Sequence, residues 1–441
     1  MNIEYQGVPI DAESAERLAA NGLRFGLVDT NDPEAFGAWL HADARGFHGA
    51  GPSEDSVETQ VRGLAYRRTT GVWDDSSAEA ASPVSTVSSW PTQLTVPGQT
   101  SVTAWAISSV TVSPTHRRRG IARAMIEAEL RTAQRFGAPL AMLTVSEATI
   151  YGRYGFAPSA LTADWTIDTR RARWTGPAAS GRVQFITPEQ LRVDGPALIE
   201  RGRLNAPGDI ERWSHQWEHL LGLVGDDKDR AKNLRVVRYD DSARIAQGFA
   251  IYRVTETVGD FSAHILDLHY LVAATDDAYA GLWRYLIEMD LVASITAPLR
   301  SADEAFTWQL SDFRAARKTW ERDHLWTRIL DVKAALETRR YGAPGNIVLE
   351  VDDPLGFADG RFLLTIEPDS LASVVPLPGT APDDAAAVAL TVNELSALYL
   401  GGVSAVSLVR AGRITELREG SAVAIDRAFR STVTPWLSIW F

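Results

Sequence analysis

Three arginines and a glycine stand together at residues 117–120. A helix that begins just after them would offer an anion its unpaired backbone N–H groups and the positive end of its dipole. Gly120 would let the backbone approach such an anion closely, because it has no Cβ. An arginine run at a helix start is otherwise mildly unfavourable, or simply a solvated basic end. We therefore interpret Arg117, Arg118 and Gly120 as a candidate phosphate-binding loop.

The elements that would position this loop follow from the spacing of apolar residues. Val110 and Val112 alternate with polar neighbours, which predicts a strand that ends near Pro114. Ile121, Met125 and later apolar residues recur every three to four positions, which predicts a helix over residues 121–136. The pattern is therefore strand, basic loop and long helix.

The composition is that of a large globular protein. The chain has 441 residues, of which 45% are hydrophobic and 23% are charged, enough for about three domains. It contains no cysteine, which excludes disulfides, thiolate catalysis and cysteine-ligated metals. The net charge of −12 argues against nucleic-acid binding. No apolar run is long enough for a membrane span, and residues 1–4 do not begin a signal peptide, so we expect a cytoplasmic protein.

The first part of the chain mixes helices and strands around this loop. We expect helices at residues 34–48 and 54–63, strands at 64–73, 94–96, 102–112 and 139–145, and a loop over 74–89. Ser146 is a predicted N-cap for a short helix that ends at Gly155.

Two sets of motifs carry a resemblance to a known family. The pattern Arg-x-x-Gly-x-Ala, which begins at Arg117, resembles the pyrophosphate loop of the GNAT superfamily of N-acetyltransferases. With the Ile-Tyr-Gly-Arg-Tyr-Gly-Phe run at 150–156, it resembles the Eis-type (enhanced intracellular survival) acetyltransferases. Further matches are Leu325-Trp326, residues 334–337, residues 398–402 and the terminal Phe441. The resemblance covers essentially the whole chain.

This resemblance implies an α+β fold of three domains, which we place at residues 1–160, 161–322 and 323–441. The first is a catalytic GNAT domain and the second a degenerate copy, because its loop at 272–277 carries Asp276 and Asp277 in place of arginines. The third resembles a sterol carrier protein. We expect strands in the second at 182–187, 234–239, 246–254, 263–273 and 294–296, with helices within 188–221 and at 277–292. In the third we expect strands at 326–332, 347–351, 361–367 and 387–391, with helices at 333–340, 393–401 and 421–430.

The resemblance also implies roles for individual residues. The backbone at Val110 and Val112 would meet the acetyl and pantetheine part of acetyl-CoA, and Ser146 would contact this co-substrate again. Tyr151 would be the general acid, because a phenol can donate a proton to a thiolate. The carboxylate of Phe441 would enter the active site and accept the proton of the amine. An apolar ending such as Trp436–Phe441 needs burial whatever its role.

The sequence says less about the amine that accepts the acetyl group. The family implies aminoglycosides, acetylated at one or several amines, and a homohexamer. Trp440 replaces a glutamate that can precede the terminal phenylalanine, and Phe47-His48-Gly49 stands where some relatives have an acidic residue. Fewer carboxylates weaken the expectation of a polycationic substrate. Protein lysines, peptides or polyamines are alternative acceptors for the same reaction. An alternative function of a different class is a non-catalytic protein that binds coenzyme A or an apolar ligand.

One competing motif concerns metal binding. His215-Gln-Trp-Glu-His219 fits the His-x-x-Glu-His pattern of some zinc peptidases. An amphipathic helix whose core residues are Trp213, Trp217, Leu220 and Leu221 explains the same residues, and no third ligand is evident. We expect no metal.

Overall fold

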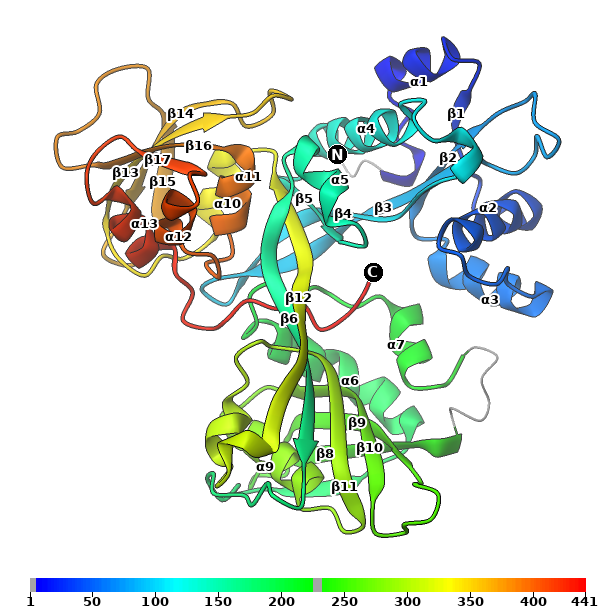
Figure 1. Cartoon of the computed structure of the whole chain (residues 1–441), viewed down its shortest axis with the longest axis vertical. Helices are drawn as coiled ribbons and strands as arrows, with labels where there is room; N and C mark the ends of the chain where they lie inside the picture. Colours follow the sequence, from blue (N-terminus) through cyan, green and yellow to red (C-terminus); the bar gives the residue numbers. More distant parts are fainter. Residues whose placement is uncertain (1–4, 225–231) are drawn as a thin grey trace.

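The computed structural model describes residues 5–224 and 232–441, so the prediction made for residues 1–4 lies outside the described residues. Figure 1 shows three lobes, two of them joined through long crossing strands and the third beside the first. The C-terminal tail runs between the lobes and ends near the centre of the molecule (Figure 1).

The first unit has the predicted elements in their predicted order, and three more that the sequence did not predict, namely α1, β1 and β6. Its helices are α1 (Ala12–Ala19), α2 (Pro33–Gly46), α3 (Glu54–Leu64), α4 (Ile121–Phe136) and α5 (Ala148–Tyr151). Its strands are β1 (Arg24–Leu27), β2 (Arg68–Trp73), β3 (Ser85–Val96), β4 (Thr100–Val112), β5 (Leu140–Thr144) and β6 (Ala157–Asp168). Helix α4 has the predicted bounds and buries Ile121, Met125 and Leu130, each such side chain contributing about 1.5–3 kcal/mol.

The second unit repeats this order. Its strands are β7 (Arg182–Phe185), β8 (Leu234–Asp240), β9 (Ala246–Thr255), β10 (His264–Ala273), β11 (Val292–Arg300) and β12 (Ala316–Ile329). Its helices include α6 (Pro188–Arg203), α7 (Ser214–Leu220) and α9 (Asp276–Ile287). A capping box at Thr187 and Gln190 fixes the start of α6.

The third unit is a separate five-stranded sheet with short helices. The strand order is β15 (Ala372–Pro376), β14 (Gly360–Ile366), β13 (Gly345–Asp352), β16 (Ala386–Thr391) and β17 (Ile414–Glu416). The helices are α10 (Val332–Thr338), α11 (Val392–Leu398), α12 (Ala405–Arg410) and α13 (Ser421–Phe429). The sequence did not predict β15, β17 or α12.

One twelve-stranded sheet runs through the first two units, in the order β1-β2-β3-β4-β5-β12-β6-β11-β10-β9-β8-β7. Strand β6 is the last strand of the first unit but pairs with β11 of the second, and β12 is the last strand of the second unit but pairs with β5 of the first. The two strands also pair with each other and cross at the centre of Figure 1. The expected boundaries at 160/161 and 322/323 lie inside these strands.

Two local predictions were wrong. The Ser-rich segment expected to be a loop over 74–89 becomes strand at Ser85, because β4 gives its backbone and hydroxyls partners; the Ser85 hydroxyl donates to the Thr111 carbonyl. Ser146 is not the N-cap of α5. That position is Glu147, whose side chain makes no capping hydrogen bond. Gly155 does end the short helical segment, at φ 89°.

Candidate active site

The basic loop before α4 has the properties of an anion-binding site. The N-cap of α4 is Gly120 at φ 78°, and no side chain caps the first turn. A Cβ on Gly120 would meet nothing within 4 Å, so the backbone there is open to a ligand. Arg117 and Arg118 are exposed, and neither side chain has an ion pair or hydrogen bond with any described residue. A pyrophosphate fits this combination of free N–H groups and free guanidinium groups.

The third arginine has a different role. Arg119 Nη1 lies 3.3 Å from Asp74 Oδ2, and His116 Nε2 lies 3.1 Å from the same oxygen. Hydrogen bonds from Ser76, His116 and Arg119 hold the pKa of Asp74 well below its usual range. Asp74 therefore holds the loop at His116 and Arg119, the two residues that flank Arg117 and Arg118. The side chains of Arg117 and Arg118 remain free.

Strands β4 and β5 separate beside this loop. Their parallel pairing covers only Ala104–Ala106 and Leu140–Met142. Beyond it, the edge of β4 that faces β5 has no strand partner among the described residues. A bulge follows, where one residue of β3 lies opposite two of β4 and Ser109 adopts φ 57°. The predicted contacts Val110 and Val112 lie on this segment of β4, beyond its pairing with β5.

Tyr151 lies at the end of the short helix that follows β5. Its side chain is 5% exposed, and its ring contacts Phe156 edge-on. Burial raises the pKa of Tyr151 to about 12, although the Ser146 hydroxyl beside it opposes part of the rise. The phenol is therefore protonated at neutral pH, as a proton donor must be.

The terminal residue lies at the same end of β5. The Thr144 hydroxyl donates a 2.8 Å hydrogen bond to a carboxylate oxygen of Phe441. The Phe441 ring packs edge-on against Trp90 at a centroid distance of 5.7 Å. Phe441, which the sequence analysis predicted as a site residue, therefore lies at the end of β5. The chain continues from this end of β5 into the short helix that holds Tyr151.

A buried histidine fixes the tail just before its end. His324, 0% exposed on β12, lies with Nε2 2.7 Å from the Ile439 carbonyl oxygen. Its ring also packs against Trp440 at 4.3 Å. Burial lowers the pKa of His324 to about 4, so the ring is neutral and Nε2–H donates to the carbonyl. The sequence analysis missed His324; the only signal was a polar residue beside the Leu325-Trp326 motif.

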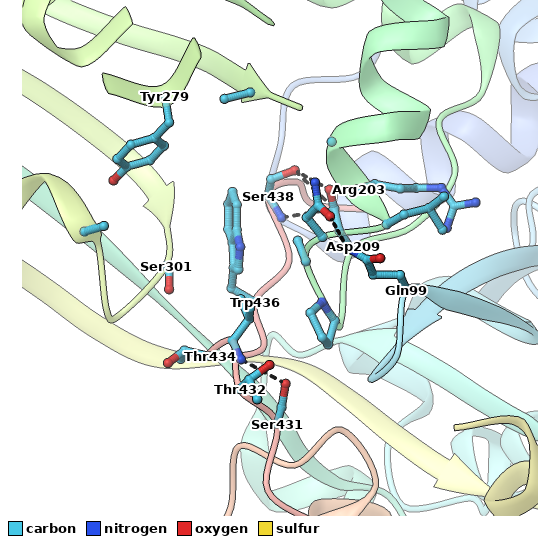
Figure 2. A pocket seen from close by; sticks show the side chains of 18 of the residues that line it. Gln99, Arg203, Asp209, Tyr279, Ser301, Ser431, Thr432, Thr434, Trp436 and Ser438 are labelled. Carbon is cyan, nitrogen blue, oxygen red and sulfur yellow. Dashed lines mark hydrogen bonds between the residues drawn. The ribbon is translucent and has the colours of Figure 1, made fainter. Parts of the chain in front are cut away.

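The preceding residues of the tail are held by a polar network in the second unit. The Ser438 hydroxyl donates to Asp209 at 3.2 Å and accepts from Arg212. Arg212 and Asp209 form an ion pair of 2.8 Å. Burial alone would lower the pKa of Arg212, but the neighbouring carboxylate raises it. Figure 2 shows Ser438 beside Asp209 and the Trp436 ring standing in the adjoining cleft.

That cleft, of about 890 Å³, lies where the three units meet: Pro97–Gln99 of the first unit and residues 340–342 and 430–434 of the third line it together with the end of β10 and the start of α9 in the second. The end of β10 and the start of α9 have the position of β4 and α4 in the first unit, since β10 and β11 also separate after a short parallel pairing that ends at Asp267 and Thr296. The helix start differs, however. Thr275 caps α9 by accepting from the Ala278 N–H, and the acidic side chain of Asp277 accepts from Ser180. A capped and acidic helix start does not suit a phosphate.

Aromatic side chains pack around one buried arginine of the first unit. Arg67, 7% exposed, lies over Trp90 at 4.1 Å and over Trp213 at 5.4 Å. Its Nε donates to the Tyr66 hydroxyl at 3.0 Å and its Nη1 to the Ser88 hydroxyl at 3.3 Å. The sequence analysis did not identify this arginine, because nothing in the chain around it has a recognisable spacing.

The alternative metal motif lies on α7. Trp217 and Leu221 are buried and Trp213 and Leu220 pack against the same core, as the amphipathic interpretation predicted. In residues 5–224 and 232–441, no group of three or more histidine, cysteine, aspartate or glutamate side chains is arranged to hold a metal ion. No helix in the same part of the chain is long and apolar enough to span a membrane.

Comparisons with known proteins agree with this architecture. Residues 29–159 and 208–342 each match an acetyltransferase (GNAT) domain, and residues 332–438 match a sterol carrier protein domain. An uncharacterized N-acetyltransferase of Streptomyces avermitilis is 37% identical over 405 residues, 90% of this chain and 94% of that one. The N-acetyltransferase Eis of Mycobacterium tuberculosis is 34% identical over 353 residues, 77% of this chain and 81% of that one. The crystal structure of Eis1 from Mycobacterium abscessus has a TM-score of 0.78 at 29% identity, covering 95% of this chain and 100% of that one.

Proposed function

Since the chain belongs to the Eis family of GNAT N-acetyltransferases and is an acetyl-CoA-dependent N-acetyltransferase, we propose that its acceptor is a primary amine of a small molecule. The reaction is direct attack in a ternary complex at the open end of β4 and β5. The observation that carries this proposal is the hydrogen bond of 2.8 Å from Thr144 to the Phe441 carboxylate, at the end of the strand that leads to Tyr151.

Each residue then has one task. Arg117, Arg118 and the N–H groups after Gly120 hold the pyrophosphate, the backbone at Val110 and Val112 orients the thioester, and Ser146 contacts the co-substrate near Tyr151.

The proposed reaction forms one bond and breaks one, and it removes one proton from nitrogen and delivers one to sulfur. The amine nitrogen bonds to the acetyl carbon while the carbon–sulfur bond breaks and its electron pair leaves with sulfur. The Phe441 carboxylate accepts the proton that leaves the nitrogen, directly or through water, and Tyr151 donates a hydrogen bond and proton to the sulfur.

The acceptor class and the assembly come from the family resemblance. Aminoglycosides, acetylated at one or more amines, are the first class to test; polyamines and lysine peptides are the alternatives. We also propose a cytoplasmic homohexamer in which residues 1–160, 161–322 and 323–441 act as catalytic, degenerate and sterol-carrier-like domains. Light scattering of the purified chain would measure the assembly.

The decisive experiment compares a variant that displaces only the terminal carboxylate with one that removes the whole terminal residue. A variant with one glycine added after Phe441 keeps the ring but moves the carboxylate by one residue, whereas deletion of Phe441 removes both. We expect both to lose thiol release from acetyl-CoA by about 10²-fold or more, with little change in KM for acetyl-CoA. Full activity in the glycine-extended variant would refute the role of the carboxylate.

A further inference from the structure

The segment that follows Tyr151 is held by a side chain of the third unit. Asn393, next to the start of α11, donates through Nδ2 to the Gly152 carbonyl at 2.7 Å and to the Phe156 carbonyl at 2.8 Å. Because an amide group carries two hydrogens on its nitrogen, each carbonyl can take one of them. A capping box that begins at Thr391 fixes the start of α11 and therefore the position of Asn393.

A buried arginine holds a third carbonyl of the same segment. Arg328 of β12, which is 0% exposed, donates from Nε to the Tyr154 carbonyl at 3.0 Å. Its Nη2 lies 2.8 Å from each carboxylate oxygen of Asp353, a residue of the third unit. A Cβ on Gly155, whose φ is 89°, would lie 2.8 Å from Arg328 Nε and 2.8 Å from Val392 Cγ1. Glycine at this turn therefore lets α11 and Arg328 approach the segment closely.

The position of the Tyr151 side chain depends on this segment. Gly152 follows Tyr151 directly in the chain, and the buried Phe156 ring packs edge-on against the Tyr151 ring at a centroid distance of 6.2 Å. Asn393 binds the carbonyls of these same two neighbours. A displacement of about 1 Å in a reacting group can slow a reaction about 10²-fold. The hydrogen bonds of Asn393 are therefore placed where they can affect catalysis.

The third unit has other contacts that dock it on the long strands. Ser396, one turn later on α11, accepts at its carbonyl from the Ser159 hydroxyl at 2.9 Å and at its hydroxyl from the Ile329 N–H at 3.1 Å. These bonds join α11 to β6 and β12, whereas Asn393 bonds to the segment between α5 and β6. We therefore expect loss of the Asn393 amide to loosen that segment while the units stay joined.

We propose that Asn393 is a positioning residue for the acetyl transfer, which acts through Tyr151 and makes the third unit a part of the active site. This inference rests on the proposed role of Tyr151 as the acid that protonates the departing sulfur. By holding the Gly152 and Phe156 carbonyls, Asn393 keeps the phenol in one place, so that its proton reaches the sulfur as the carbon–sulfur bond breaks.

The test is a double-mutant cycle of Asn393→Ala and Tyr151→Phe, with acetyl-CoA as the donor and tobramycin or spermidine as the acceptor. We expect Asn393→Ala to lower kcat about tenfold or more without changing KM for acetyl-CoA. In the Tyr151→Phe background the same substitution should lower kcat by less than about twofold, because the group it positions is gone. If Asn393→Ala does not fold, Asn393→Asp takes its place, since it keeps the shape of the side chain but removes both donors.

The control is Asn346→Ala, at another half-buried asparagine of the third unit, whose amide nitrogen lies 3.3 Å from Asp384. It should behave as the parent protein in both backgrounds. Equal losses of kcat from Asn393→Ala in both backgrounds would overturn the inference, as would an unchanged kcat in Asn393→Ala when Tyr151→Phe is impaired. Either result leaves the proposed function intact. An unchanged kcat in Tyr151→Phe would instead refute the proposed acid, and this inference with it.

Hydrogen exchange measures the hold on the segment directly. We expect the backbone N–H groups of residues 148–156 to exchange about tenfold faster in Asn393→Ala than in the parent protein, while exchange in the control variant stays as in the parent. Unchanged exchange in Asn393→Ala would overturn the inference, because the segment would then be held without Asn393. This measurement needs no acceptor, so it decides the matter even if neither tobramycin nor spermidine is acetylated.

Discussion

His324 makes the position of the C-terminal tail sensitive to pH. The side chain is 0% exposed, and its neutral ring donates from Nε2 to the Ile439 carbonyl at 2.7 Å. Its Nδ1 is buried with no hydrogen-bond partner, so a second proton there would be an uncompensated charge. Replacement by glutamine keeps a donor at a similar reach but removes the titratable group.

The magnitude follows from the two pKa values. In the unfolded chain His324 binds a proton near its usual pKa of 6.5, whereas in the folded protein burial lowers that pKa to about 4. The stability contributed by the neutral ring is therefore complete above pH 6.5 and is lost as the pH falls toward 4. At ~1.36 kcal/mol per pKa unit, the full loss is about 3 kcal/mol, of which about 2 kcal/mol is reached at pH 5.

The assay is chemical denaturation of the parent protein and His324→Gln, followed by tryptophan fluorescence. The difference in free energy of unfolding between them should shrink by about 2 kcal/mol from about pH 7.5 to pH 5. The comparison is needed because Asp43, with a pKa raised to about 6, adds stability over the same range as the pH falls. Both proteins contain Asp43, so its effect cancels. Replacement of the exposed His41 by glutamine serves as the control. The difference in free energy of unfolding between the parent and His41→Gln should not change between about pH 7.5 and pH 5. A constant difference for His324→Gln would refute the reasoning.

Three further predictions concern the proposed active site and the C-terminal tail. Tyr151→Phe should lower kcat by about 10²-fold or more without changing KM for acetyl-CoA, because it removes a proton donor but keeps the ring; an unchanged kcat would exclude Tyr151 as the acid. The double variant Arg117→Gln, Arg118→Gln should raise KM for acetyl-CoA about tenfold or more but not KM for S-acetylpantetheine, which lacks the pyrophosphate; equal losses with both donors would contradict the assignment. Trp436→Ala removes the ring that lies 4.8 Å from the Arg300 guanidinium and should lower kcat through a looser tail, whereas Trp436→Phe should retain most activity. Steady-state kinetics measure all three, and an alanine variant as active as the parent would show that this contact does not position Phe441.

The sequence by itself determined several local elements of the first unit. The spacing of Ile121, Met125 and their successors is enough to define α4, because a helix buries one face whatever it packs against. The basic residues before Gly120 indicated an anion site, since the free N–H groups of a helix start are a local property. The acidic residues at 276 and 277 likewise indicated that the second unit had lost that site.

Tertiary structure alone decided what surrounds these elements. The exchange of β6 and β12 between units depends on pairing between strands about 160 residues apart, which leaves no periodic signal in either segment. Asp43 follows Phe36 and Leu40 on one face of α2, so the sequence contains a carboxylate in an apolar stripe, but only the packing of the helix shows that burial raises its pKa to about 6.

The same holds for the tail. An apolar ending demanded burial, yet where it is buried depends on His324 in β12, Thr144 in β5 and Ser438 against Asp209 of the second unit. Sequence patterns determine which faces must be covered, because hydrophobic periodicity is local. Which distant group covers them is a matter of three-dimensional contacts between segments far apart in the chain.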